Sequence, residues 1–195
     1  MEKLDTTTRK KQITESVMEV IASEGIQNLT MKKIADRIGI SDAALYRHFN
    51  TKNDMLVYMV GQIEIGLISH IKEKAELREE PLDQLKEVLV QHLKYVENKP
   101  AIPTILFSEA LHYEDHRLKN KIARLLNDYR NFIKSILDEA TAQQQVRQNL
   151  DTQIAAEMVI GVIQSTVIFW SLSDHSYSVA ENSEKIWEQL YNSLK

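Results

Sequence analysis

The sequence predicts an all-α protein: an N-terminal three-helix bundle with a helix-turn-helix, joined by a long helix to a C-terminal helical domain, with about nine helices in all. Its 195 residues include five glycines and three prolines, together about 4% against roughly 12% in average usage, which favours long helices. Apolar residues also recur at helical spacing along most of the chain. We expect domains at residues 1–52 and 53–195.

The composition of the chain excludes several classes of protein and several kinds of site. The chain is 43% hydrophobic and 27% charged, which is typical of a globular protein and excludes collagen-like and disordered classes. It has no cysteine, so disulfides, thiolate metal sites and cysteine nucleophiles are excluded. The polar N-terminus lacks an apolar signal region, and the most apolar stretch, 158–172, is short for a membrane span. We therefore expect a cytoplasmic protein without membrane contact.

Three helices are predicted first, and capping residues mark their ends. They are 4–24, ending at Gly25; 31–38, between the N-cap Thr30 and Gly39; and a helix that Ser41 caps and that runs through Phe49.

Six further helices are predicted in the body. Thr51 caps a helix whose apolar stripe continues to about residue 78, and Pro81 opens the next at 82–97. Pro100 and Pro103 bracket a break before the helix 104–113. The remaining predicted helices are 115–142, 154–172 after the cap Asp151, and 178–195. The 154–172 helix is apolar almost all round, so we expect it to be buried.

Residues 30–49 have the spacing of a helix-turn-helix. Ala35 is small enough for two helices to cross closely, Gly39 permits the turn, and Ile40 and Leu45 fill the angle between the helices. Ser41 caps the second helix, so its N-terminal amides can face phosphate, with Asp42, Ala43, Ala44, Tyr46 and Arg47 near the exposed edge.

A family resemblance rests on these residues and on those that follow. Thr30, Ile34-Ala35, Gly39-Ile40-Ser41, Leu45-Tyr46-Arg47-His48-Phe49 and Lys52 resemble the N-terminal signature of the TetR family of one-component transcriptional regulators. The resemblance covers about residues 10–60. It implies a dimeric protein, usually a repressor, that binds a pseudo-palindromic operator in double-stranded DNA and leaves it when its C-terminal domain binds a small-molecule effector.

The resemblance also assigns roles to single residues. It implies phosphate contacts by Thr30, Tyr46, His48 and Lys52, and base contacts by Ala43, Ala44 and Arg47. Leu45 and Phe49 are expected in the core of the bundle. Asp42 departs from the family pattern, because its carboxylate would be repelled by phosphate unless it accepts from a cytosine amine or pairs with a cation.

The body residues suggest an effector site and a dimer interface. A largely hydrophobic effector would be lined by Leu67, Ile71, Phe107, His112, Tyr129, Phe132 and Met158. The last two helices carry more apolar surface than one small bundle needs to bury, which predicts a four-helix dimer interface through Gly161, Ser165, Ile168, Ile186, Trp187 and Leu190.

Two other functions stay open. Glu109, His112 and His116 have i, i+3, i+7 spacing, which suggests a metal-binding helical-bundle enzyme, although no second Glu-x-x-His is present and we predict no metal site. No Gly-rich phosphate loop, Gly-x-Ser-x-Gly or His-Glu-x-x-His motif occurs, so no catalytic residue and no cofactor is predicted. The second alternative is a DNA-binding member of the same family that has no effector, such as a chromosome-organising protein.

Overall fold

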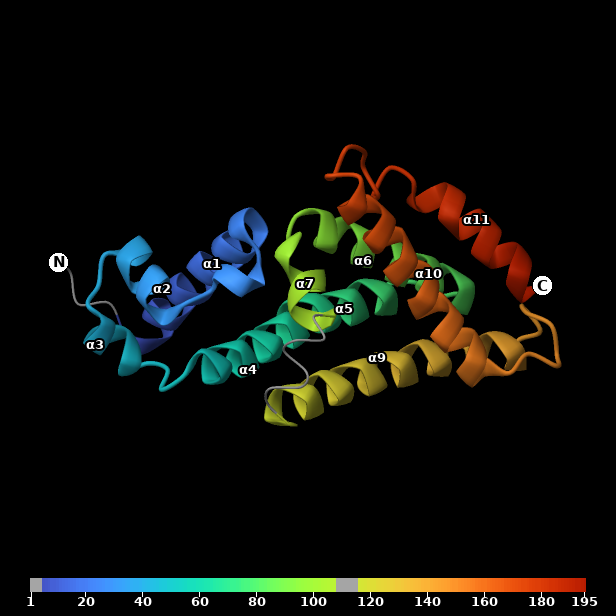
Figure 1. The fold of residues 1–195 in the computed structure, drawn as a ribbon. Helices are drawn as coiled ribbons and strands as arrows, with labels where there is room; N and C mark the ends of the chain where they lie inside the picture. The colour runs from blue at the N-terminus through green and yellow to red at the C-terminus, as the bar shows by residue number, and fades with distance from the viewer. Residues whose placement is uncertain (1–4, 108–115) are drawn as a thin grey trace. The chain divides into compact units, whose positions relative to one another are not determined.

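The computed structural model describes residues 5–107 and 116–195, and these residues form helices without any strand (Figure 1). The helices are α1 (Thr6–Glu24), the 3₁₀ turn η1 (Ile26–Asn28), α2 (Met31–Ile38), α3 (Asp42–Tyr46), α4 (Lys52–Ile63), the π-helix η2 (Glu64–Ser69), α5 (His70–Glu76), α6 (Pro81–Glu97), α7 (Ala101–Phe107), α9 (His116–Ala142), α10 (Thr152–Leu172) and α11 (Ser183–Leu194). The all-α fold class is confirmed.

The chain divides into two compact units. The first, which we call the N-terminal unit, contains residues 1–63 and 99–122. Within it α1 packs against α2 and α7, α2 against α3, and α4 against α7. Its core is formed by side chains without solvent exposure, among them Ile13, Val17, Ile34, Leu45 and Met55.

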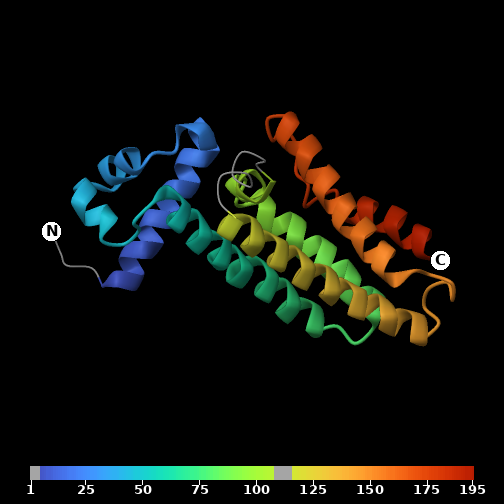
Figure 2. The same ribbon diagram turned by 60° about the horizontal axis from the view of Figure 1, so that its bottom comes forward.

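The second unit, which we call the body unit, contains residues 64–98 and 123–195. Here α6 packs against α5, α10 and α11 (Figure 2). Hydrogen bonds join α9 to α10, where Arg130 Nη1 donates to Glu157 at 3.0 Å and Thr152 donates to Asp138 at 2.6 Å. Ile71, Leu85, Leu89, Ile133 and Leu137 form its buried centre.

Local capping explains where several helices begin. Thr30, Ser41 and Asp151 were predicted as N-caps, and each side chain accepts a backbone N–H of the helix that follows it. Asp5 does the same for α1, with Oδ1 accepting from Thr7 at 2.8 Å and from Thr8 at 3.0 Å.

Some predicted helix boundaries differ from the observed ones. The expected α-helix from 51 to about 78 contains the π-helix η2, and its last turn ends at Glu76. Pro103 does not precede a helix but is the third residue of α7, where its missing N–H would have no intrahelical partner anyway. Helix α3 ends at Tyr46 rather than at Phe49, and α11 begins at Ser183 rather than at residue 178.

The expected burial of α10 is wrong for one of its faces. Ala155, Val159, Ile163 and Trp170 are buried, but the side chains of Ile154, Met158, Ile168, Phe169 and Leu172 are 49–77% exposed. Among the described helices, α10 is long and apolar enough to cross a membrane, but only by length and composition, and the core helix of a globular protein passes the same test. The apolar content of α10 predicted burial of the whole helix, but it does not say which faces meet the rest of the chain.

Candidate DNA-binding surface

Helices α2 and α3 form the predicted helix-turn-helix. Gly39 lies between them with φ 69° and ψ 37°, a left-handed conformation that favours glycine. The Gly39 N–H donates to Asp36 O at 3.2 Å, and the Ile40 N–H donates to Ala35 O at 3.0 Å, which closes the end of α2. These bonds fix the angle at which the chain enters α3.

Hydroxyl groups hold the first turns of both helices. Thr30 Oγ1 accepts from the Lys33 N–H at 3.2 Å, and Ser41 Oγ accepts from the Ala44 N–H at 3.2 Å. Both residues are exposed, and a hydroxyl that accepts one bond can still donate another. The cap roles are therefore compatible with the predicted phosphate contact of Thr30.

The residues predicted to read bases, Ala43, Ala44 and Arg47, lie on α3 or directly after it, next to Asp42 and Tyr46. Asp42, Ala43 and Arg47 are exposed, Ala44 is half-buried, and Tyr46 is 48% exposed. Asp42 is the first residue of α3, where the helix dipole stabilises a carboxylate.

Two neighbours of these residues lie in the core instead. Leu45 has no solvent exposure, and Phe49 is 4% exposed. Their expected core positions are confirmed.

Three cations place positive charge near His48. Its pKa is lowered, first because the imidazole is partly buried and then because Arg9, Lys10 and Arg47 place positive charge near it. Arg9 and Lys10 lie on α1, which the sequence analysis did not assign to the DNA-binding residues. The basic run 9–11 was the available signal, but its distance from His48 depends on the fold.

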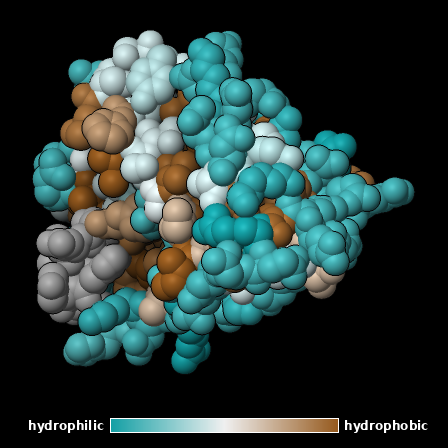
Figure 3. Space-filling model, turned by 90° about the vertical axis from the view of Figure 1, so that its right-hand side faces the viewer, coloured by the Kyte–Doolittle hydropathy of each residue, from teal (hydrophilic) through white to brown (hydrophobic). Residues whose placement is uncertain are grey.

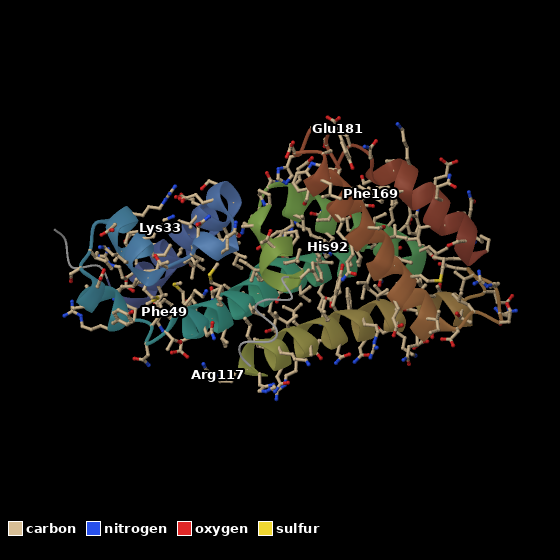
Figure 4. The ribbon with its side chains drawn as sticks, in the orientation of Figure 1. Lys33, Phe49, His92, Arg117, Phe169 and Glu181 are labelled. Carbon is tan, nitrogen blue, oxygen red and sulfur yellow. The ribbon has the colours of Figure 1, made fainter. Side chains whose placement is uncertain are left out.

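Lys10 also joins three parts of the N-terminal unit. Its ammonium lies 5.2 Å from the centre of the Phe49 ring and 5.0 Å from that of Tyr58, and the two rings are themselves 5.4 Å apart. Phe49 is labelled in Figure 4. These contacts connect α1, the segment after α3, and α4. Lys52, the predicted phosphate ligand, is the half-buried first residue of α4.

Two cations of α2 are paired with carboxylates of α1. Lys33 Nζ lies 2.6 Å from Glu24 Oε2, and Arg37 Nε lies 3.1 Å from Glu19 Oε2. These carboxylates reduce the positive potential around α2, in contrast to the group formed by Arg9, Lys10 and Arg47.

The predicted effector residues do not all lie together. Leu67, Ile71 and Tyr129 are buried in the body unit and Phe132 is half-buried, whereas Met158 lies on the exposed face of α10. Phe107 belongs to the N-terminal unit and is 42% exposed, and His112 lies outside the described residues. Sequence reasoning missed His92, whose Nδ1 is 2.9 Å from the Tyr129 hydroxyl; burial lowers the pKa of His92 to about 4.

The predicted dimer residues lie on α10 and α11. Gly161, Ser165 and Ile168 are exposed on α10, and Ile186 and Trp187 are half-buried on α11. Leu190 is only 4% exposed and lines, with Met158, Val162, Phe169 and Ile186, a groove of about 670 Å³.

Two family models match the chain. Residues 13–59 match the model described as bacterial regulatory proteins, tetR family, and residues 59–193 match the model described as YsiA-like protein, C-terminal region. The chain belongs to the TetR family. As a member, it is a DNA-binding transcriptional regulator, and the resemblance seen in the helix-turn-helix motif is confirmed.

Similar proteins of this family have different roles. The chain is 28% identical over 188 residues to the nucleoid occlusion factor SlmA of Vibrio vulnificus, covering 96% of each protein. It is also 28% identical over 187 residues to the fatty acid metabolism regulator protein of Bacillus subtilis, covering 94% of each.

Two solved structures of FadR regulators share the fold over nearly the whole chain. The fatty acid degradation regulator FadR from Bacillus halodurans aligns with a TM-score of 0.86 over 100% of this chain and 99% of that one, at 24% identity. FadR from Bacillus subtilis in complex with stearoyl-CoA aligns with a TM-score of 0.83 over 95% of this chain and 99% of that one, at 25% identity.

The metal hypothesis gains no support from the described residues. Glu109 and His112 lie outside them, and His116 is the exposed first residue of α9. Within residues 5–107 and 116–195, no three His, Cys, Asp or Glu side chains form a group that could hold a metal ion. The similar proteins include two that are described as regulators of fatty acid metabolism or degradation.

Proposed function

We propose that the chain is a cytoplasmic homodimeric repressor that leaves a pseudo-palindromic operator when it binds a largely hydrophobic effector, and that this effector is a long-chain acyl-CoA. The observation that carries the proposal is the likeness to two FadR proteins, which extends over the DNA-binding helices and the body alike. One of those proteins was solved with stearoyl-CoA.

The body unit has a composition suited to an acyl chain. Leu67, Ile71 and Tyr129 are buried, and the hydrogen bond between Tyr129 and His92 places one hydroxyl and one imidazole beside each other. Ligand sites commonly combine an apolar lining with a few polar groups that fix orientation. We propose that these four residues contact the effector.

The exposed face of α10 and α11 supports the dimer. Monomeric proteins rarely leave a large contiguous apolar patch in water, and two copies could bury theirs as a four-helix interface. Hydrophobic side chains gather on one part of the face shown in Figure 3, beside a hydrophilic part. A two-fold dimer would present two α3 helices to half-sites whose centres are roughly 34–36 Å apart, or a multiple of that distance.

The likeness to SlmA favours a second candidate, a DNA-binding protein that acts without an acyl-CoA effector. Its identity to this chain is the same 28% over a similar length. The two candidates differ in their response to ligand, and both use the same helix-turn-helix.

Fluorescence anisotropy with the DNA upstream of the chain's own gene tests the proposal. Stearoyl-CoA should weaken operator binding by about 5- to 150-fold, which corresponds to a coupling of 1–3 kcal/mol, and operator DNA should weaken stearoyl-CoA binding by the same factor. Free coenzyme A is the matched control and should have no effect. Tight DNA binding that stearoyl-CoA leaves unchanged, at many sites across the chromosome, would favour the second candidate.

A further inference from the structure

The helical run from residue 52 to 76 changes its hydrogen-bond register once. Helix α4 ends at Ile63, η2 covers Glu64–Ser69, and α5 begins at His70 without an intervening loop. A π-helix bonds residue i to i+5, so it inserts an extra residue into a turn, and such segments are frequent at functional sites. One inserted residue corresponds to a rotation of about 100° around an α-helix.

A side chain from α6 packs against η2. A Cβ at Gly66 would lie 2.5 Å from the Tyr95 hydroxyl oxygen, a distance that real Cβ atoms do not show. Gly66 therefore lets Tyr95 approach the backbone of η2 closely.

A hollow of about 420 Å³ lies beside η2 within the body unit. Glu64, Ile68 and Ser69 of η2 contribute to its lining, and Asp128 and Phe132 contribute from α9. A molecule in this hollow would touch η2 and α9 at the same time. The volume lies within the range of small-molecule sites.

Three charged side chains line the hollow, Glu64, Lys72 and Asp128, and among the described residues no ion pair joins Lys72 to either carboxylate. Lys72 Nζ lies 5.2 Å from the centre of the Phe132 ring, and within the part of the chain that the structure describes it has no carboxylate within 4.0 Å. Asp128 is exposed and has no cationic partner among the same residues. Ile68 and Leu125, 5% and 3% exposed, supply apolar surface to the lining.

We propose that this hollow binds a small zwitterion with an apolar side chain, of which an apolar α-amino acid is the simplest example. The acid group of the ligand pairs with Lys72, its ammonium pairs with Asp128, and its side chain covers Ile68 and Leu125. The pairing neutralises Lys72 and Asp128 over an apolar surface, which neither a fatty acid nor an alkylamine would do. The hollow contains none of the four residues proposed to contact the acyl-CoA effector.

Isothermal titration of the full chain with L-leucine, in the absence of DNA and acyl-CoA, tests the site. We expect saturable binding, weakened at least tenfold by Lys72→Met and by Asp128→Asn. The matched controls Lys74→Met and Glu73→Gln change neighbouring charges outside the hollow and should leave binding unchanged.

Two leucine derivatives assign the charges. N-acetyl-L-leucine lacks the ammonium, so its weaker binding should not respond to Asp128→Asn; L-leucinamide lacks the acid, so its binding should not respond to Lys72→Met. Amide hydrogen exchange across residues 64–69 should slow when leucine binds. Absence of saturable binding up to about 10 mM, or binding that leaves exchange in 64–69 unchanged, would overturn the proposal. Either result leaves the acyl-CoA proposal standing, because that proposal is tested with operator and stearoyl-CoA.

Discussion

Substitution of Gly66 by alanine tests how η2 packs against Tyr95. In the native chain a new Cβ would meet the Tyr95 hydroxyl oxygen at 2.5 Å, so one of the two groups must move. Overpacking of this kind costs roughly 1–3 kcal/mol, while replacing glycine by alanine in a helix gains about 1 kcal/mol. We therefore expect Gly66→Ala to lower the free energy of unfolding by about 0–2 kcal/mol.

The same substitution should act differently once the hydroxyl is removed. In Tyr95→Phe the nearest remaining side-chain atom, the ring Cζ, would lie 3.6 Å from the Cβ, an ordinary contact distance. Gly66→Ala should then stabilise the chain by up to about 1 kcal/mol, which gives a coupling energy of about 1–3 kcal/mol between the two sites.

Urea denaturation of the four proteins, followed by circular dichroism, measures that coupling. Gly61→Ala is a matched control on α4, because its Cβ would meet only the Lys121 side chain at 3.9 Å. Equal effects of Gly66→Ala in both backgrounds would refute the proposed packing.

Four further predictions concern DNA binding, assembly and pH. The pKa of His48 is lowered in the free protein, and a bound phosphate would favour its protonated form. Operator affinity should therefore rise as pH falls from about 7.5 towards 6, and an equal rise in His48→Gln would contradict this. Lys52→Ala should reduce the slope of log affinity against log salt concentration by about one unit in anisotropy titrations, and an unchanged slope would show that Lys52 does not contact phosphate. Arg47→Ala should instead change the preferred DNA sequence. Ile168→Glu should give helical monomers that lose operator binding, and a dimer by light scattering would place the interface elsewhere. Burial lowers the pKa of His92 from 6.5 to about 4, so as pH falls the imidazole takes up its proton in the unfolded chain before it does in the folded one. The free energy of unfolding should therefore fall by about 2–3 kcal/mol between pH 6.5 and pH 4, as measured by chemical denaturation. An equal fall in His92→Gln would assign the effect to other groups.

The helix-turn-helix was the most predictable part of the molecule because its determinants are local. Thr30 and Ser41 are caps whose partners lie three residues away, and Gly39 ends α2 at the predicted residue. Arg9 and Lys10 were missed for the opposite reason, since only tertiary packing brings α1 to His48 and Phe49. Periodicity along one helix carries no information about which cations from another helix lie beside it.

Two features of the body differ from the sequence prediction, the π-helix η2 and the exposed face of α10, and both depend on tertiary contacts. Gly61 and Gly66 both weaken the predicted long helix, but the π segment contains only Gly66, the glycine against which Tyr95 packs. On α10, Val159 and Phe169 are equally apolar in sequence, yet one is buried and the other is 68% exposed. The apolar pattern of a helix cannot show whether a face packs within its own chain or against another surface, because both kinds of face are apolar. In the proposed dimer, a second copy of the chain would cover the exposed face of α10.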